Sequence, residues 1–152
     1  MQTASSIDTK ARKAALDSLA AAPSRALAEL WARWADKPVH TRVRGPEVGL
    51  VMVRGRAGGG GAPFNLGEAT VSRASVRIVT GEVGHGYNLG RDTAKAEVIA
   101  IIDALWQRDP VRVQAEIIAP LQALAVSSDQ KRRDESAATK VDFFTLVRGE
   151  DT

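Results

Sequence analysis

The residue types with the clearest chemical potential stand close together in residues 54–61. Two arginines and four glycines make up most of this segment: Arg54, Arg56, Gly58, Gly59, Gly60 and Gly61. Backbone N–H groups of consecutive glycines can turn inward around an anion, and guanidinium groups can balance its charge. The segment is not a P-loop, because no Gly-Lys-Ser/Thr sequence follows it. The same glycines suit a flexible hairpin connection, or a loop that becomes ordered only against another subunit.

Four more polar residues are candidates for binding a ligand or a partner. Arg73 and Arg77 fall on one face of an expected strand, where they would clamp a phosphate or form salt bridges at an interface. His85 lies in the next expected strand, although a single strand histidine more often packs or faces solvent than acts as a base. Arg91 precedes an expected helix, whose dipole it opposes unless an anion or Asp92 offsets the charge.

Several classes of chemistry are excluded by residue counts. The chain has no cysteine, which removes disulfides, thiolate zinc sites, iron–sulfur clusters held by this chain and cysteine nucleophiles. Its two histidines, His40 and His85, are too few for most metal sites. No serine stands in a nucleophile-elbow context, and no carboxylate pair is spaced as in glycosidases. We expect no catalytic residue, no metal ligand and no cofactor bound by this chain.

Gly84, Gly86 and Gly90 precede an expected helix and invite comparison with a dinucleotide-binding motif. That motif needs a parallel βαβ unit with an acidic residue at the end of a second strand, about 20 residues later. Here that distance falls inside the expected helix, so the comparison fails. Alternating Gly84 and Gly86 instead predict a strand whose small face lets another backbone approach closely.

The charge of +3 is unevenly distributed along the 152 residues. Residues 1–39 carry six basic and four acidic groups, and residues 92–152 carry eight basic and eleven acidic groups. Residues 40–91 carry three acidic groups and seven basic groups, all of them arginine. Because the guanidinium fork matches planar and tetrahedral oxyanions, this middle segment favours phosphate or carboxylate partners, although solvated strand edges would look the same.

The elements that position these residues are expected to form one α+β domain, residues 1–152. Hydrophobic residues are 44% of the chain and charged residues 26%, as in an ordinary globular protein. Residues 1–38 form an N-terminal helical segment, residues 39–91 a strand-rich arginine and glycine segment, and residues 92–149 further helices and a last strand. No run approaches the roughly 18 apolar residues of a membrane span, so we expect a cytoplasmic protein.

Within residues 1–91, spacing predicts helices over 8–35, interrupted at Pro23, and then an antiparallel sheet meander. The expected strands are 39–44, 48–56, 69–79 and 82–89. The continuous apolar run Leu50–Val53 is typical of a central strand buried on both faces.

Beyond residue 91, Asp92 is expected to cap a long amphipathic helix over 93–107, which ends at Asp109-Pro110. Pro120 argues against a helix interior, so we predict an extended segment over 111–121. A polar helix over about 122–138 and a C-terminal strand from Val141 to Val147 complete the α+β arrangement.

Taken in order, several short motifs resemble the PhnG family, the small subunit of the bacterial phosphonate carbon–phosphorus lyase core complex. The resemblance covers about residues 42–149, and its most distinctive motif is Val141–Gly149. The other motifs are Arg54–Gly61, Phe64–Thr70 leading to Arg73, Gly86-Tyr87, Gly90–Asp92, Ala96-Glu97, Asp103–Leu105 and Ala119–Leu121.

The resemblance implies a subunit of a hetero-oligomer that holds two copies each of four different subunits. In that family, the complex takes part in displacing adenine from ATP by methylphosphonate, which gives ribose 1-methylphosphonate 5-triphosphate. ATP is then a substrate of the complex, the nucleosidase-like chemistry belongs to a large neighbouring subunit, and an iron–sulfur cluster belongs to another subunit. The resemblance supplies no catalytic residue to carry onto this chain, so it implies an accessory subunit with partner-binding surfaces.

An alternative from the residues alone is a stand-alone phosphate- or nucleic-acid-binding module built on Arg54, Arg56, Arg73 and Arg77. It predicts nucleotide or RNA binding that falls steeply with salt concentration. The resemblance makes nucleic acid the less favoured partner.

Overall fold

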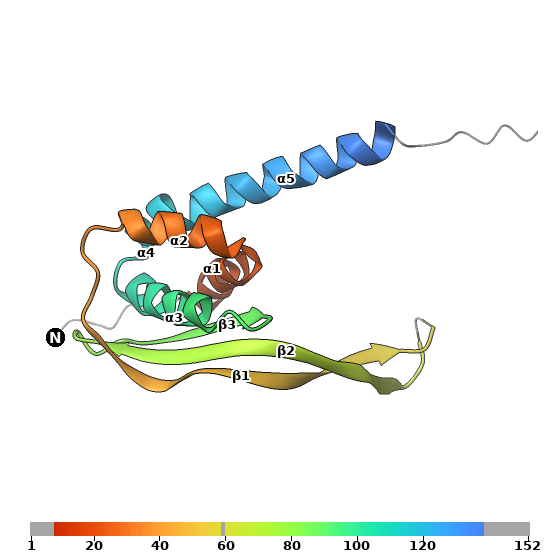
Figure 1. Cartoon of the computed structure of the whole chain (residues 1–152), viewed down its shortest axis with the longest axis horizontal. Coiled ribbons are helices and arrows are strands. Elements are labelled where there is room, and N and C mark those ends of the chain that lie inside the picture. Colours follow the sequence, from red (N-terminus) through yellow and green to blue (C-terminus); the bar gives the residue numbers. More distant parts are fainter. Residues whose placement is uncertain (1–7, 59, 139–152) are drawn as a thin grey trace, which may run out of the picture.

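The computed structural model describes residues 8–58 and 60–138, which form a layered α+β fold (Figure 1). A three-stranded antiparallel sheet has the strand order β1-β2-β3, and the helices cover one of its two faces (Figure 1). The predicted fold class and the antiparallel meander are therefore confirmed. The predicted strand from Val141 to Val147 lies outside the described residues. No helix in the described part of the chain is long and apolar enough to cross a membrane.

The elements follow one another along the chain with short connections. They are α1 (Thr9–Ala21), α2 (Ser24–Arg33), β1 (His40–Arg56), β2 (Pro63–Ile78), β3 (Val83–Leu89), α3 (Thr93–Arg108), α4 (Pro110–Val113), the π-helix η1 (Gln114–Ile118) and α5 (Ala119–Ala138).

The N-terminal helices begin and end where the sequence predicts. The Asp8 carboxylate accepts hydrogen bonds from the backbone N–H groups of Lys10 and Ala11 at 3.0 and 3.2 Å, and so caps α1. Pro23 separates α1 from α2, because the proline ring cannot continue a helix. Asp92 caps α3 in the same way as Asp8 caps α1, through the Lys95 N–H at 2.9 Å.

Helix α3 lies directly against the sheet, because two glycines of β3 leave no side chain between the helix and the strand. A Cβ placed on Gly84 would lie 1.9 Å from the carbonyl oxygen of Ala100, and one on Gly86 would lie 1.8 Å from that of Ala96. The predicted close backbone approach at these glycines is confirmed. Small residues on both sides therefore set the distance between helix and sheet.

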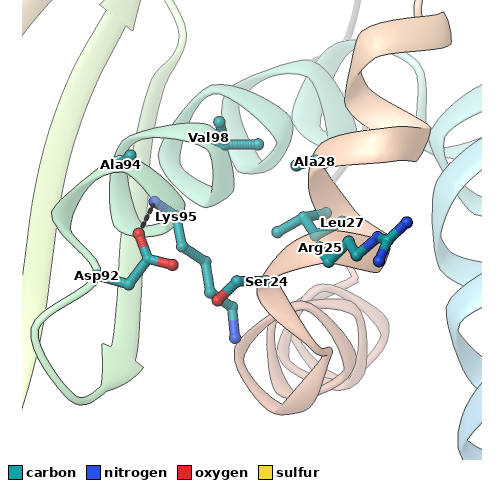
Figure 2. A pocket seen from close by; sticks show the side chains of 8 residues that line it. All are labelled: Ser24, Arg25, Leu27, Ala28, Asp92, Ala94, Lys95 and Val98. Carbon is teal, nitrogen blue, oxygen red and sulfur yellow. Dashed lines mark hydrogen bonds between the residues drawn. The ribbon is translucent and has the colours of Figure 1, made fainter.

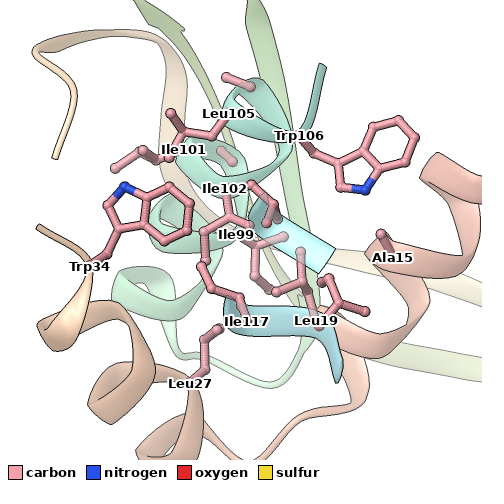
Figure 3. Close-up of a cluster of buried hydrophobic side chains, with 14 of the residues drawn as sticks. Ala15, Leu19, Leu27, Trp34, Ile99, Ile101, Ile102, Leu105, Trp106 and Ile117 are labelled. Atoms are coloured by element: carbon pink, nitrogen blue, oxygen red, sulfur yellow. The ribbon is translucent and has the colours of Figure 1, made fainter. Parts of the chain in front are cut away.

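The hydrophobic core lies between α3 and the other helices as well as between α3 and the sheet. Figure 3 shows Leu19 and Leu27 from the N-terminal helices, Ile99 and Ile102 from α3, and Ile117 from η1. Each of these five side chains is at most 1% exposed. Because all four helical segments contribute to one cluster, removal of any of them would open the core to water.

The prediction of a central strand at residues 48–56 is wrong. Residues 40–56 form one long strand, β1, which lies at the edge of the sheet and pairs only with β2. A bulge around Gly45 and Pro46 joins what the sequence divided into two strands. The Leu50 and Met52 side chains are each 63% exposed rather than buried.

The prediction of an extended segment over 111–121 is also wrong, because these residues are helical throughout. In η1 the N–H of Ala119 bonds to the carbonyl of Gln114, five residues back, so the helix is locally wider. This wider turn lets Pro120 follow without the clash that a regular α-helix would impose. The predicted polar helix over about 122–138 is confirmed within α5.

Glu97 of α3 holds the start of β1 against the helical layer. Its two carboxylate oxygens accept hydrogen bonds from Nε and Nη2 of Arg42 at 2.7 and 2.9 Å. His40 Nε2 lies 3.4 Å from the same carboxylate. The Arg42 hydrogen bond is the main cause that lowers the pKa of Glu97, against a smaller opposing effect of burial.

We predict that Gly84→Ala lowers the free energy of unfolding by at least about 2 kcal/mol, because its Cβ would force α3 away from the sheet. Urea unfolding followed by circular dichroism measures the change. Gly67→Ala is the matched control in another strand, since a Cβ there meets no atom within 4 Å. We expect that control to change the stability by less than about 0.5 kcal/mol. Equal losses in the two variants would contradict the close-approach argument.

We predict that Glu97→Gln removes on the order of 1 kcal/mol of stability at neutral pH. Because the folded state lowers the pKa of Glu97 below its ordinary value of 4.5, this contribution is present above that pH and is lost as the pH falls further. Unfolding free energies of wild type and variant should therefore converge in acid. Glu68→Gln, at an exposed carboxylate of β2, is the control. A difference that stays constant from pH 7 to pH 3 would count against the Arg42 contact as its cause.

Candidate functional site

The residues singled out from the sequence fall in three separate places on the fold. Arg54, Arg56, Gly58, Gly60 and Gly61 lie at the far end of the β1–β2 hairpin. Arg73, Arg77 and His85 lie in β2 and β3, and Arg91 is exposed in the connection to α3. Arg54 pairs with Asn65, eight residues before Arg73 along β2, which at ~3.3 Å per residue separates the two arginines by about 26 Å. One phosphate group cannot contact both.

The glycine-rich segment connects β1 to β2, as the hairpin interpretation predicts. The N–H of Gly61 donates to the carbonyl of Gly58 at 3.0 Å, and Gly58 has a φ of 53°, in the region that favours glycine. Gly60 is exposed, and Gly59 lies outside the described residues. Anion binding by this segment stays a prediction.

The hairpin forms an arm that extends beyond the rest of the fold. We define the arm as Val48–Arg56 of β1 with Pro63–Thr70 of β2. Strand β3 pairs with β2 only from Val71 to Arg77, so among residues 8–58 and 60–138 the arm has two strands. Figure 1 shows it extending past β3 and away from the helices that cover the sheet. Two-stranded ribbons are marginally stable in water without further packing.

One face of the arm is lined by large apolar side chains. Val48, Leu50 and Met52 lie opposite Ser72, Thr70 and Glu68, so they share the face that the helices cover further along the sheet. Beyond the register shift between Val53 and Arg54, the Leu66 and Phe64 side chains lie beside Gly55 toward the end of the arm. These five side chains are 44–64% exposed: Val48, Leu50, Met52, Phe64 and Leu66. We call this set the apolar arm face.

The opposite face of the sheet, away from the helices, carries a charged cluster centred on Glu47. Oxygen Oε1 of Glu47 accepts a hydrogen bond from Nε of Arg44 and another from Nε of Arg73, both at 2.7 Å. These hydrogen bonds lower the pKa of Glu47, and the one from Arg44 contributes more than the one from Arg73. The bulge at Gly45 brings Arg44 and Glu47 together on this face. The bulge needs a glycine, because the φ of Gly45 is 65° and a Cβ there would lie 2.8 Å from the Arg73 carbonyl oxygen.

His85 lies beside this cluster on β3. Its Nδ1 is 2.9 Å from the Ser75 hydroxyl, and its backbone N–H donates to Oδ2 of Asp103 at 2.8 Å. Arg77 lies two residues beyond Ser75 and is exposed. The structure thus brings Arg73 and His85 close together, leaves Arg77 to one side and places Arg91 elsewhere.

Sequence reasoning missed Arg44, Glu47 and Asp103. Asp103 is 1% exposed in α3, and both of its oxygens accept hydrogen bonds from Arg12 of α1, at 2.8 and 2.7 Å. A charged residue in the middle of the apolar run Ile99–Leu105 was the available signal, since buried carboxylates are normally paired. The Arg44–Glu47 pair depends on a bulge, which the sequence pattern did not reveal.

A largely apolar pocket of about 310 Å³ lies between α2 and α3 (Figure 2). Lys95 enters it, but its ammonium group donates to the carbonyl oxygens of Ala20 and Ala22 at 2.8 and 2.5 Å. Burial lowers the pKa of Lys95, and Asp92 partly opposes that effect. Because Lys95 closes the end of α1 in this way, we assign it a structural role.

No group of three or more histidine, cysteine, aspartate or glutamate side chains among residues 8–58 and 60–138 is arranged to hold a metal ion.

Comparison with known proteins gives two findings. The family model described as "Phosphonate metabolism protein PhnG" matches residues 10–149. The chain is also similar to the "Alpha-D-ribose 1-methylphosphonate 5-triphosphate synthase subunit PhnG" of Rhizobium meliloti strain 1021. The two are 53% identical over 141 residues, which cover 92% of this chain and 90% of the relative.

We predict that Arg44→Gln raises the pKa of the Glu47 carboxyl toward its ordinary value, because the variant removes the hydrogen bond that lowers it most. Arg73→Gln should raise it by a smaller amount. A ¹³C NMR titration of the side-chain carboxyl measures both shifts. Arg77→Gln removes the same charge from the same sheet face without touching Glu47, and should leave the pKa unchanged. Equal shifts in all three variants would mean that long-range charge, rather than the hydrogen bonds, sets this pKa.

Proposed function

Since this chain belongs to the PhnG family of phosphonate metabolism proteins, we propose that it is an accessory subunit of a ribose 1-methylphosphonate 5-triphosphate synthase complex. In this proposal the complex displaces adenine from ATP with methylphosphonate. The chain contributes binding surfaces to the assembly, and other subunits carry out the bond-breaking chemistry. The support for this role is the name of the relative from Rhizobium meliloti together with the shape and exposed apolar side chains of the arm.

The apolar arm face is the single observation that carries the proposal. Five large apolar side chains project from a two-stranded ribbon that neither the helices nor β3 support. Contiguous exposed apolar surface on such an element is typical of a protein–protein interface. The partner we propose is another subunit of the same synthase, with an apolar surface that buries Leu50, Met52 and Leu66.

The charged groups of the described residues support an accessory role for the chain. Asp103, Glu97 and Glu47 each receive hydrogen bonds from arginine, and each pair joins two different elements or two parts of the sheet. A carboxylate held in this way by guanidinium groups fixes the geometry of the elements that it joins. We therefore assign these acids to holding the fold together.

We predict that the double variant Leu50→Glu/Leu66→Glu loses assembly while keeping its fold. Buried charges without partners are costly at an interface, so the amount of the other synthase subunits recovered with the tagged chain should fall at least tenfold. The measurement is co-expression with those subunits, affinity purification and quantitative mass spectrometry. Circular dichroism of the purified variant checks that the helices remain.

Val79→Glu provides the matched control, because Val79 is 76% exposed at the other end of the sheet. It should leave recovery within twofold of wild type. If the wild-type chain is recovered without the other synthase subunits under mild salt, the proposed function is wrong. If the double variant assembles as well as Val79→Glu, the arm is not the docking element.

A further inference from the structure

A small hollow on the outer face of the sheet brings together the polar groups beside Glu47. Its volume is about 190 Å³, well above that of a single water molecule. It lies over the middle of β2 and β3 and at the bulge of β1, away from the arm. Its lining residues are Arg44, Arg73, Ala74, Ser75, His85, Gly86 and Tyr87.

Both arginines of the hollow keep donors available for a ligand. Arg44 and Arg73 each use only Nε for Glu47, at 2.7 Å. Within the described part of the chain, the terminal Nη groups of these two arginines donate no hydrogen bond. Glu47 therefore acts as a brace that holds two guanidinium groups side by side and leaves the outer ends of both forks open.

The wall formed by β2 and β3 adds further hydrogen-bonding groups. The Ser75 hydroxyl and His85 Nδ1 are 2.9 Å apart, which fixes the orientation of the imidazole ring. Tyr87 stands directly opposite Arg73 in the strand register and is 45% exposed. The hollow thus has guanidinium donors at the β1 bulge and on β2, and hydroxyl and imidazole groups beside them.

We propose that this hollow binds a tetrahedral phosphorus oxyanion, the group shared by phosphate, phosphate esters and phosphonates. A planar carboxylate is satisfied by one guanidinium fork, whereas a tetrahedral group with three oxygens uses donors from several directions. Two forks on different strands, with a hydroxyl and an imidazole beside them, provide that arrangement. Consecutive strands hold these groups, so the site is built before the ligand arrives.

The charge balance favours an anion in the hollow. Arg44 and Arg73 supply two positive charges, Glu47 behind them supplies one negative charge, and no carboxylate is among the described residues that line the hollow. Glu47 fixes the forks but also repels an anion, so its removal should change affinity in the direction opposite to loss of either arginine. Because general attraction to a basic surface predicts the same two signs, the loss of an equal charge at the neighbouring Arg77 is the comparison that distinguishes a built site.

Binding of the oxyanion does not depend on the proposed function, but the physiological occupant does. Within a synthase assembly, the candidates would be the phosphonate group and the triphosphate of the nucleotide. Inorganic phosphate, methylphosphonate and tripolyphosphate are therefore the three probes, and their relative affinities distinguish the two sources.

The test is a titration of each probe into the ¹⁵N-labelled full-length chain, with Arg Nε and His85 signals followed by NMR at constant ionic strength. We expect saturable shifts at the hollow with wild type. Arg73→Gln should weaken binding at least tenfold, and Glu47→Gln should tighten it at least twofold. Arg73→Lys, which keeps the charge but removes the fork, should resemble Arg73→Gln.

Arg77→Gln is the control, because it removes one charge from a neighbouring position on the same sheet face. It should leave the affinity within twofold of wild type. The proposal is overturned if no probe gives saturable shifts, if Arg77→Gln and Arg73→Gln weaken binding equally, or if Glu47→Gln weakens it. None of these results bears on subunit recovery through the arm, so each proposal can fail without the other.

Discussion

The direct contact between the backbones of α3 and β3 is the constraint on which the other elements depend. Gly84 and Gly86 have no side chains, so the carbonyl groups of Ala96 and Ala100 approach the strand at distances that any Cβ would prevent. This brings Asp103 of α3 within 2.8 Å of the His85 N–H and within reach of Arg12. Helix, strand and N-terminal helix are thereby fixed against one another by one buried carboxylate, and the apolar core forms around that junction.

This packing also decides which surfaces remain open. The helices cover one sheet face only as far as β3 extends, and β3 stops pairing at Val71. Beyond that point β1 and β2 continue as the arm, whose side chains keep the alternation of a half-buried sheet although nothing in the described residues covers them. The same strands present Glu47 and its two arginines on the opposite face. The exposure of the apolar arm face is therefore a consequence of the short third strand.

Local patterns were reliable wherever the chain's own neighbours decide the structure. Asp8, Pro23 and Asp92 fixed helix boundaries through capping and ring sterics, which act over a few residues. The alternation of β2 and β3 was also readable, as was the need for a close approach at Gly84 and Gly86. For the caps and the alternation the physical cause lies within about one helical turn or one strand pair, whereas the two glycines were readable because the missing side chain is itself the signal.

Two predictions failed because their outcome depends on distant parts of the chain. An apolar run such as Leu50–Val53 has the same sequence signature in a central strand and in an arm that a partner would cover. Pro120 blocks a regular α-helix, but the preceding π-turn removes the clash, and the packing of Ile117 and Ile118 into the core stabilises that turn.

The amino-acid sequence by itself determined the fold class, the caps, the glycine contact face and the family motifs, because these depend on residue type and short spacing. Only the tertiary structure decided which arginines act together. Arg73 joined Arg44, 29 positions earlier in the chain, and not Arg54 or Arg77, because strand register and the bulge at Gly45 set which side chains meet around Glu47. Register is a property of two paired strands, so no single segment of sequence contains it.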